Sequence, residues 1–371
     1  MRTRRSSLSI FGAALACAII PALQAISHAQ SQPTPRQSLL VLSKHDHTLS
    51  IVDPATLKVI GRAPVGPDPH EVVASDDGKT AYVSIYGGGQ YHTLNVIDLV
   101  GQKALADIDT GALNGPHGLA FAGGKVWFTA EGAKAIARYD PATSKIDWIM
   151  GTGQNRTHML YVTAGEKQIY TTNVNAATVS ILELTPQQLR PPPMRPGGQS
   201  GQPQGGPPPG GLPPGVGGPP RMDWNQTVVP VGKGDEGFDV SPDGRELWTA
   251  NAQDGTVSVI DIPGKRAVAT LDAKVFGANR LKFTLDGKHV LISMLGDTDL
   301  VIYNASKRTE EKRVKIGHGA AGILIEPGGN RAFVSCGPDN YVAIIDLKTL
   351  EVSGHIEAGG EPDGLAWAAQ N

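Results

Sequence analysis

Hydrophobic and polar residues alternate along most of this chain in short runs of four to six residues. The clearest stretch, 237–271, holds four such runs, each bounded by turn residues: Phe238–Ser241, Glu246–Ala250, Thr256–Asp261 and Arg266–Leu271. A period of two places successive side chains on opposite faces of a β-strand. The tripeptide Pro242-Asp243-Gly244 between the first two runs is typical of a tight hairpin turn. The stretch therefore predicts a unit of four antiparallel strands.

The same four-strand unit recurs with a period of about 41 residues. Its first strand begins near seven positions: His70, His117, His158, Glu236, Asn279, Ala321 and Asp363. The successive steps are 47, 41, 78, 43, 42 and 42 residues, and the step of 47 contains a longer loop at 86–92. The step of 78 contains a stretch rich in proline and glycine from Pro186 to Met222, and subtracting its 37 residues returns 41. We therefore expect a disordered insertion at 186–222 within one unit, not a linker between domains.

Seven first strands predict an all-β fold over residues 30–371: one seven-bladed β-propeller with four antiparallel strands in each blade. The N-terminal segment 39–65 holds only three strands, and the C-terminal segment 363–368 supplies the missing fourth. The two ends of the chain should therefore share one blade and close the ring without an open sheet edge. Three tryptophans in strand positions are expected to pack between blades: Trp127, Trp248 and Trp367.

Two family resemblances accompany this repeat. The segments Ser241–Gly244, Leu247–Asn251 and Thr256–Asp261 resemble the YVTN-type repeat, and the resemblance extends over essentially all of residues 30–371. It implies a seven-bladed propeller that is commonly exported, and it implies little about activity. One blade, with Gly115–Leu119 and Val126–Glu131, is similar to the repeats of streptogramin B lyase, a metal-dependent propeller enzyme. Because a single blade shows this second pattern well, it assigns no catalytic residues.

Residues 1–29 have the three parts of a secretory signal peptide. Three arginines lie within the first five residues, and 8–26 is mostly apolar. Ser27-His28-Ala29 then offers small residues at the two positions that favour cleavage before Gln30. A proline at position 21 shortens the uninterrupted apolar run below the length that a bilayer requires. We expect an exported protein, periplasmic or extracellular, without a membrane span after cleavage.

Two other export routes remain open. Arg4-Arg5 is compatible with twin-arginine export, and Cys17 with lipoprotein processing.

Cleavage removes three arginines and no acid, so the formal net charge changes from −2 to −5. Such a mild imbalance gives no reason to expect nucleic acid or an anionic membrane as a partner. Cys336 is then the remaining cysteine, and we interpret it as a small packed residue.

Histidines gather at one end of the predicted strands. Of nine that follow residue 29, seven fall in connections between blades or between second and third strands: His45, His47, His70, His92, His117, His158 and His318. His70, His117 and His158 hold the same repeat position, at the start of the innermost strand, in three consecutive blades. Their imidazoles should therefore approach the channel mouth from one side. Three neutral imidazoles suit one divalent transition metal (zinc, copper, nickel or iron) and leave a coordination position open.

Other polar residues occupy equivalent positions. Glu236, Asn279 and Asp363 hold the histidine position in three further blades, and Ala321 is the non-polar residue there. Glu236 and Asp363 are candidates for a general base or acid that acts with a metal-bound water. A second set is expected to bind ligand, because its members end the second strands or lie at the mouth: Glu131, Asn173, Asn251 and Asn279.

Two functions fit these observations. A Pro-His-Gly turn can be purely structural, which favours an exported, non-catalytic propeller that binds a small polar ligand or a protein partner at its loop-rich channel face. The ring of histidines and carboxylates instead favours a metal-dependent hydrolase or lyase with a small polar substrate. No serine lies in a recognisable nucleophile elbow, and a fold alone implies no activity. The binding hypothesis is therefore preferred, with the metal enzyme as the alternative.

Overall fold

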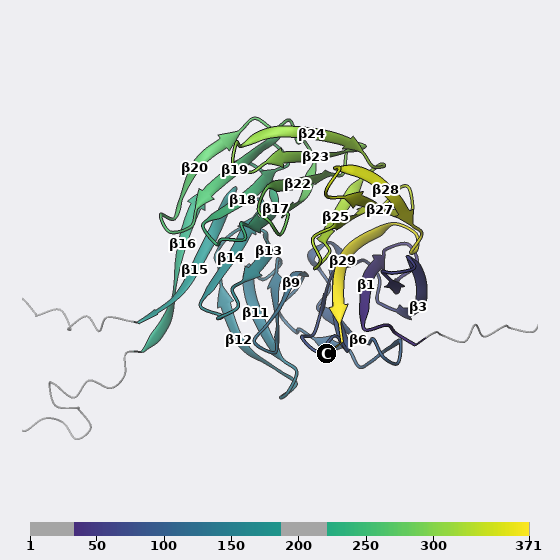
Figure 1. Ribbon diagram of the computed structural model, residues 1–371. Helices are drawn as coiled ribbons and strands as arrows, with labels where there is room; N and C mark the ends of the chain where they lie inside the picture. The colour runs from purple at the N-terminus through teal and green to yellow at the C-terminus, as the bar shows by residue number, and fades with distance from the viewer. Residues whose placement is uncertain (1–32, 187–220, 371) are drawn as a thin grey trace, which may run out of the picture. The chain divides into compact units, whose positions relative to one another are not determined.

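In the computed structural model, which describes residues 33–186 and 221–370, seven antiparallel sheets surround a central channel (Figure 1). We number these blades 1 to 7 by their innermost strands: β4 (Pro69–Ala74), β9 (Pro116–Ala122), β13 (Thr157–Val162), β17 (Asp235–Val240), β21 (Ala278–Phe283), β25 (Ala320–Ile325) and β29 (Pro362–Ala369). Each of the seven predicted repeat starts is the second residue of one of these strands. The predicted seven-bladed propeller is confirmed.

Blades 2 to 6 each continue outward through three more strands. Blade 2 adds β10 (Lys125–Ala130), β11 (Ala135–Asp140) and β12 (Lys145–Gly151), and blade 3 adds β14 (Gln168–Asn173), β15 (Thr178–Pro186) and β16 (Met222–Pro230). Blade 4 adds β18 (Glu246–Asn251), β19 (Thr256–Asp261) and β20 (Arg266–Leu271), and blade 5 adds β22 (His289–Met294), β23 (Asp299–Asn304) and β24 (Thr309–Lys315). Blade 6 adds β26 (Arg331–Cys336), β27 (Tyr341–Asp346) and β28 (Glu351–Ile356). Successive strands are neighbours in each sheet, so every described connection within these blades is a simple hairpin; the connection between β15 and β16 lies outside the described residues.

Blade 7 joins the two ends of the described chain. Its order is β29, β1 (Gln37–Ser43), β2 (Thr48–Asp53) and β3 (Lys58–Pro64). Figure 1 shows β29, in yellow, beside β1, in purple, and Leu39 pairs with Trp367 across them. The shared blade is therefore confirmed, and it supplies a partner for β1 that no nearby part of the chain offers.

Blade 1 departs from the four-strand pattern. After β4, β5 (Thr80–Ile85) and β6 (Thr93–Asp98), its outer edge is split into β7 (Lys103–Ala104) and β8 (Ile108–Asp109), both paired with β6. Between the two short strands, Asp107 accepts a hydrogen bond from the side chain of Asn95 at 2.7 Å. This side-chain bond lies at the interruption and ties the segment between the two short strands to β6.

The apolar core lies between neighbouring blades. Trp127 of blade 2 packs with Leu160 and Ile169 of blade 3. Trp248 meets Phe283 of the next blade with ring centroids 5.7 Å apart, and Trp367 stacks on Phe333 at 6.3 Å. The expected packing of the tryptophans between blades is confirmed. Cys336 is fully buried in another such core, where burial raises the pKa of its thiol to about 12, as suits a packed residue.

In four of the innermost strands (β9, β17, β25 and β29), close contact with a neighbouring innermost strand depends on glycine at the third position. A Cβ on Gly118 would lie 2.6 Å from the carbonyl oxygen of His158, and a Cβ on Gly364 would lie 2.3 Å from that of His70. No real side chain tolerates such contacts, so the absence of a Cβ lets neighbouring strands approach. The residues just before these glycines are thereby brought together at one end of the channel.

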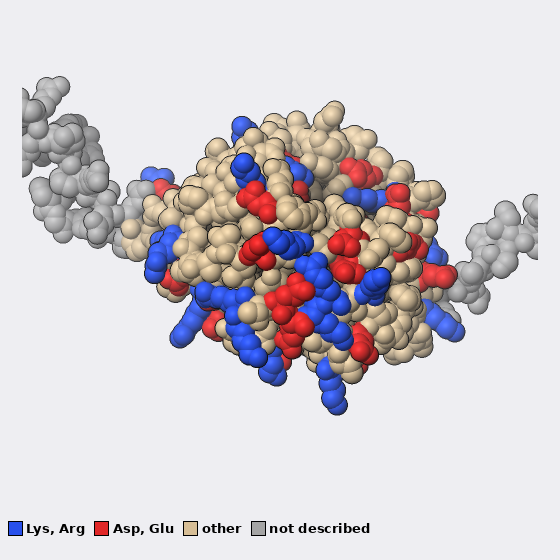
Figure 2. Space-filling view, turned by 90° about the horizontal axis from the view of Figure 1, so that it is seen from above, with Lys and Arg blue, Asp and Glu red and all other residues tan. Residues whose placement is uncertain are grey.

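Two sequence predictions fall on parts of the chain that the structure does not describe. The proposed signal peptide, residues 1–29, lies outside the described residues, and so does nearly all of the insertion at 186–222. Its two ends are described: Pro186 of β15 pairs with Met222 of β16, so both belong to the sheet of blade 3. Figure 2 shows acidic and basic side chains interspersed over the face that it presents. Within 33–186 and 221–370, no helix is long and apolar enough to cross a membrane.

Candidate functional site

The second residues of the innermost strands converge at one end of the channel. A cavity of about 350 Å³ lies there, and all seven of these residues line it: His70, His117, His158, Glu236, Asn279, Ala321 and Asp363. Because these residues hold the same position at the start of each innermost strand, every blade contributes one of them to the mouth. The cavity is therefore bordered by every blade of the ring.

The three histidines form a row across blades 1 to 3. The ring centroids of His70 and His117 are 5.0 Å apart, and those of His117 and His158 are 3.9 Å apart. His117 and His158 are buried, with 2% and 1% of their surface exposed, whereas His70 is partly exposed. Their polar surroundings differ, and the differences decide what each can do.

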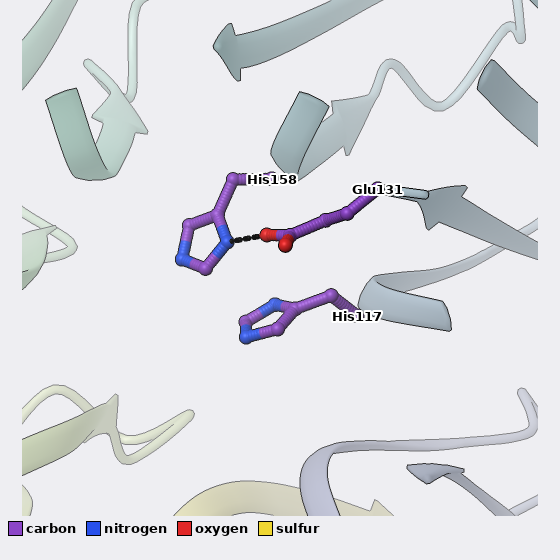
Figure 3. Close-up of side chains that lie close together, drawn as sticks. All are labelled: His117, Glu131 and His158. Atoms are coloured by element: carbon purple, nitrogen blue, oxygen red, sulfur yellow. Dashed lines mark hydrogen bonds and ion pairs between the residues drawn. The ribbon is translucent and has the colours of Figure 1, made fainter. Parts of the chain in front are cut away.

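His158 lies between two carboxylates. Its Nδ1 donates to Glu131 (Figure 3), and its Nε2 is 2.8 Å from Glu236 Oε2, close enough for an ion pair but outside hydrogen-bond geometry. Burial lowers the pKa of His158, but the charges of Glu236 and Glu131 and their hydrogen bonds outweigh burial, so the pKa is raised. These carboxylates favour a positive charge at this point.

Glu131 and Glu236 are themselves held by cations. Arg156, from the connection that precedes β13, places Nη1 3.0 Å from Glu236 Oε1 and Nε 3.4 Å from Glu131 Oε1. Tyr86 donates its hydroxyl to the other oxygen of Glu131. Burial would raise the pKa of both carboxyls, but His158 and Arg156 reverse the effect, lowering the pKa of Glu131 and taking that of Glu236 to about 2. Both are carboxylates at neutral pH.

His117 has no carboxylate of its own. Burial, followed by the nearby charges of His158 and His70, lowers its pKa well below the ordinary value, so the imidazole is neutral. Its Nδ1 is buried and has no hydrogen-bond partner among the residues that the structure describes. Figure 3 shows the His117 ring beside the His158–Glu131 pair, with a ring nitrogen turned toward them. A neutral imidazole with a free nitrogen is the protonation state that binds metals.

His117, Glu131 and His158 form one potential metal-binding group. Each can offer a ligand atom, and these atoms lie within 4.8 Å of one another. Ligands of a single zinc ion, each about 2.0–2.2 Å from the metal, are separated by roughly 3–3.5 Å. Small side-chain adjustments would therefore bring the three atoms onto one ion.

His70 belongs to a different set of contacts. Its Nδ1 is 3.2 Å from both the backbone oxygen and the carboxylate of Asp68, and its Nε2 accepts from Lys44 Nζ at 3.1 Å. Lys44 also makes an ion pair with Asp363 at 2.6 Å. The lone pair that His70 would give to a metal is thus engaged by an ammonium group. Among the described residues, the potential metal-binding group contains Glu131 in place of His70, which the sequence analysis grouped with His117 and His158.

The predicted ligand-binding asparagines separate into two environments. Asn173 and Asn251 are fully buried and do not line the cavity. Each donates from its amide to a serine of its own blade at 2.9 Å: Asn173 to Ser180 and Asn251 to Ser258. Asn279 does line the cavity, and its Oδ1 is buried without a partner.

An ion pair crosses the channel below the mouth. Arg280 of β21 contacts Glu71 of β4, and both are third residues of their strands, one residue further from the mouth. Blades 5 and 1 stand nearly opposite in a seven-bladed ring, so the pair spans the channel. Burial lowers the pKa of Arg280, but the charges of Glu71 and Asp363 outweigh it and raise the pKa.

The residues at the mouth that were not predicted from the sequence include four with polar side chains that contact the predicted ones: Lys44, Tyr86, Arg156 and Arg280. Arg156 precedes His158 by two residues and Arg280 follows Asn279 directly, so proximity to the repeat position was an available signal for both. Lys44 and Tyr86 come from loops after second strands, and nothing in their spacing indicates that they reach histidines of another strand.

Comparisons with known proteins show the fold and no activity. No protein-family model matches the chain, and no curated protein matches it. A functionally unknown protein from Desulfotomaculum acetoxidans DSM 771 is 13% identical with a TM-score of 0.65, over 90% of this chain and 99% of that one. A candidate 6-phosphogluconolactonase from Bacteroides uniformis ATCC 8492 is 14% identical with a TM-score of 0.67, over 90% and 100%. The dihydro-heme d1 dehydrogenase NirN, solved in complex with DHE, is 15% identical with a TM-score of 0.58, and this chain covers 65% of its length.

Proposed function

We propose that this protein is an exported propeller that binds a small polar ligand at its channel mouth, and that one divalent transition metal bound by His117, Glu131 and His158 is the centre of that site. The observation that carries the proposal is His117 Nδ1, a buried nitrogen without a partner on a neutral ring. Buried polar atoms in folded proteins nearly always have a partner. A metal ion would provide one.

The charges around His158 also favour a metal. Glu131 and Glu236 stabilise a proton on His158, and they would stabilise a divalent cation in the same place by the same attraction. Two imidazoles and one carboxylate form a donor set suited to zinc, and nitrogen donors also suit copper, nickel and iron. Three protein ligands leave a coordination position for a ligand atom from the cavity.

Binding is favoured over the alternative, a metal-dependent hydrolase or lyase, by the state of the two candidate general bases. Glu236 is paired with Arg156 and has a pKa of about 2, and Asp363 is paired with Lys44. A general base works best when its pKa is near the working pH. Glu236 is therefore a poor proton acceptor near neutral pH. The cavity volume is within the range of small-molecule sites, which favours a small ligand over a protein partner.

The test is zinc titration of the metal-stripped protein by calorimetry, with bound metal counted by elemental analysis. We expect one zinc per chain for wild type. His117→Ala should weaken binding by more than about 100-fold, because loss of an outer-shell partner alone costs roughly 10–100-fold. His70→Ala should keep one zinc, since Lys44 engages that imidazole.

His318→Ala is the matched control. This histidine has an exposed side chain near Asp339 in a connection between blades, and its loss should leave zinc binding unchanged. If wild type binds no zinc, nickel or copper at neutral pH, or if His117→Ala binds zinc as wild type does, the proposal is wrong. Loss of zinc in His70→Ala with retention in Glu131→Gln would instead support the triad of His70, His117 and His158.

A further inference from the structure

Part of the wall of the mouth cavity is apolar and centres on blade 6, whereas blades 5 and 7 also supply the polar or charged residues Lys44, Asn279, Arg280, Glu361 and Asp363. The lining residues that lack charged or hydrogen-bonding side chains all come from blades 5, 6 and 7: Leu295, Gly319, Ala321, Gly337, Pro338 and Pro362. Leu295 directly follows β22, and its side chain is 53% exposed. Phe276, with 58% exposure, lies next to Gly277, whose carbonyl accepts from the backbone of Leu295 at 2.9 Å. Large apolar side chains therefore stand at this part of the rim.

The apolar wall faces the metal-binding group across the cavity. Successive blades of a seven-bladed ring are rotated by about 51°, so blade 6 lies opposite the boundary between blades 2 and 3. Blade 6 supplies Ala321 and Pro338, while blades 2 and 3 supply His117 and His158. A molecule bound to the metal at one end would place its other end against Leu295 and Pro338.

The cavity also limits the length of its ligand. The ion pair between Arg280 and Glu71 crosses the channel beneath it, so a ligand enters and leaves through the mouth. The volume of about 350 Å³ lies at the lower end of the range of small-molecule sites, which suits a small organic acid. The cations Lys44 and Arg156 that border the histidines are already paired with Asp363 and Glu236, so an anionic end of the ligand would be attracted chiefly by the metal.

Asn279 adds a second requirement. Its Oδ1 is buried without a partner, and its side chain lines the cavity in blade 5, on the way from the histidines to Leu295. A ligand that carries a hydroxyl beside its anionic end would satisfy this amide. It would also give a divalent metal two oxygen donors.

We propose that the ligand is a 2-hydroxy carboxylic acid with an apolar side chain of aromatic or branched aliphatic type. The carboxylate and hydroxyl bind at the His117–Glu131–His158 metal and near Asn279, and the side chain packs on Leu295 and Pro338. This inference rests on the proposed function, because it uses the metal centre, and it adds the class of ligand and the residues that select it.

Two hydroxy acids that differ in one group provide the test: mandelate, with a phenyl group, and lactate, with a methyl group. Each is titrated calorimetrically into the zinc-loaded protein. We expect mandelate to bind at least tenfold more tightly than lactate. Leu295→Asn should reduce that preference to less than about threefold without changing zinc stoichiometry. Leu285→Asn is the matched control, because Leu285 is equally exposed, at 53%, but lies in the turn after β21, at the other end of that strand.

The outcomes separate the two proposals. If wild type binds no zinc, the proposed function fails, and the ligand class fails with it. If zinc binds but mandelate is no tighter than lactate, or if the preference survives in Leu295→Asn, the ligand class alone is wrong. Equal loss of preference in Leu285→Asn would also overturn it, because the effect would then not come from the cavity wall.

Discussion

A buried carboxyl in blade 4 should make the protein less stable as pH rises. Asp235, the first residue of β17, is fully buried. Its Oδ2 accepts the backbone N–H of Asn173 at 3.0 Å, and its Oδ1 is buried with no partner. Burial raises the pKa of Asp235 to about 8, despite the opposing effects of hydrogen bonds from the backbone and of the His158 charge. The side chain is therefore protonated in the folded protein at neutral pH.

The sign of the effect follows from proton binding. Between pH 4 and 8 the folded state holds a proton on Asp235 that the unfolded state releases, so the free energy of unfolding falls as pH rises. The limiting slope is about 1.4 kcal/mol per pH unit, which gives a ceiling of about 4 kcal/mol between pH 5 and 8. Asp235→Asn removes the proton and keeps an acceptor for Asn173. Its stability relative to wild type should therefore rise across this range, by an amount on the order of that ceiling.

Guanidinium denaturation followed by tryptophan fluorescence at pH 5, 6, 7 and 8 measures this difference directly. The comparison with wild type cancels the contributions of His158, Glu131 and Glu236, which also titrate. Asp243→Asn is the control, because hydrogen bonds from Ser241 and Arg245 lower the pKa of that turn residue. The stability of the Asp243 variant relative to wild type should not change above pH 5. A constant difference for Asp235→Asn over the same range would refute the reasoning.

Three further predictions follow from the fold and the site. Removal of residues 361–371 deletes β29 and exposes the edge of β1. The truncated protein should therefore lose its cooperative thermal transition in circular dichroism. A thermal transition like that of wild type would refute the shared blade. Replacement of residues 187–221 by a short Gly-Ser turn should change the melting temperature by less than about 2 °C, the shift that an effect of roughly 1 kcal/mol produces in a domain of this size, because Pro186 already pairs with Met222. A larger fall would contradict this. Glu236→Gln removes a charge that raises the pKa of His158, so the pH midpoint of zinc binding, measured by calorimetry, should shift downward. An unchanged midpoint would show that Glu236 does not control the proton on His158.

The fold could be predicted from the sequence because each blade repeats the same local pattern. Runs such as Thr256–Asp261, turns such as Pro242-Asp243-Gly244 and a regular spacing are all local, and seven copies leave one way to close the ring. The split outer edge of blade 1 was not predictable in this way. A hydrogen bond between the side chains of Asn95 and Asp107 lies at the split, and the local alternation contains no sign of it.

The candidate site was predictable in position but not in grouping. Equivalence in the repeat placed His70, His117 and His158 at the mouth, because one strand position faces the channel in every blade. Which of them share partners depends on residues that arrive from other blades. Lys44 reaches His70 only because blade 7 closes against blade 1, and that contact has no signature in residue spacing.

The charges at the mouth explain why His117 is the centre of the proposed site. The other ionisable side chains around it are matched across blades: Lys44 with Asp363, Arg156 with Glu236, and Arg280 with Glu71. His158 is matched with Glu131, and His70 with Lys44 and Asp68. His117 is also deeply buried, but among the described residues its Nδ1 has neither a hydrogen-bond partner nor a carboxylate paired with it, whereas His158 Nε2, also without a hydrogen bond, lies 2.8 Å from Glu236. A group that binds at His117 Nδ1 would therefore satisfy a nitrogen that its neighbours leave unpaired, and the adjacent carboxylate of Glu131 makes that group a cation.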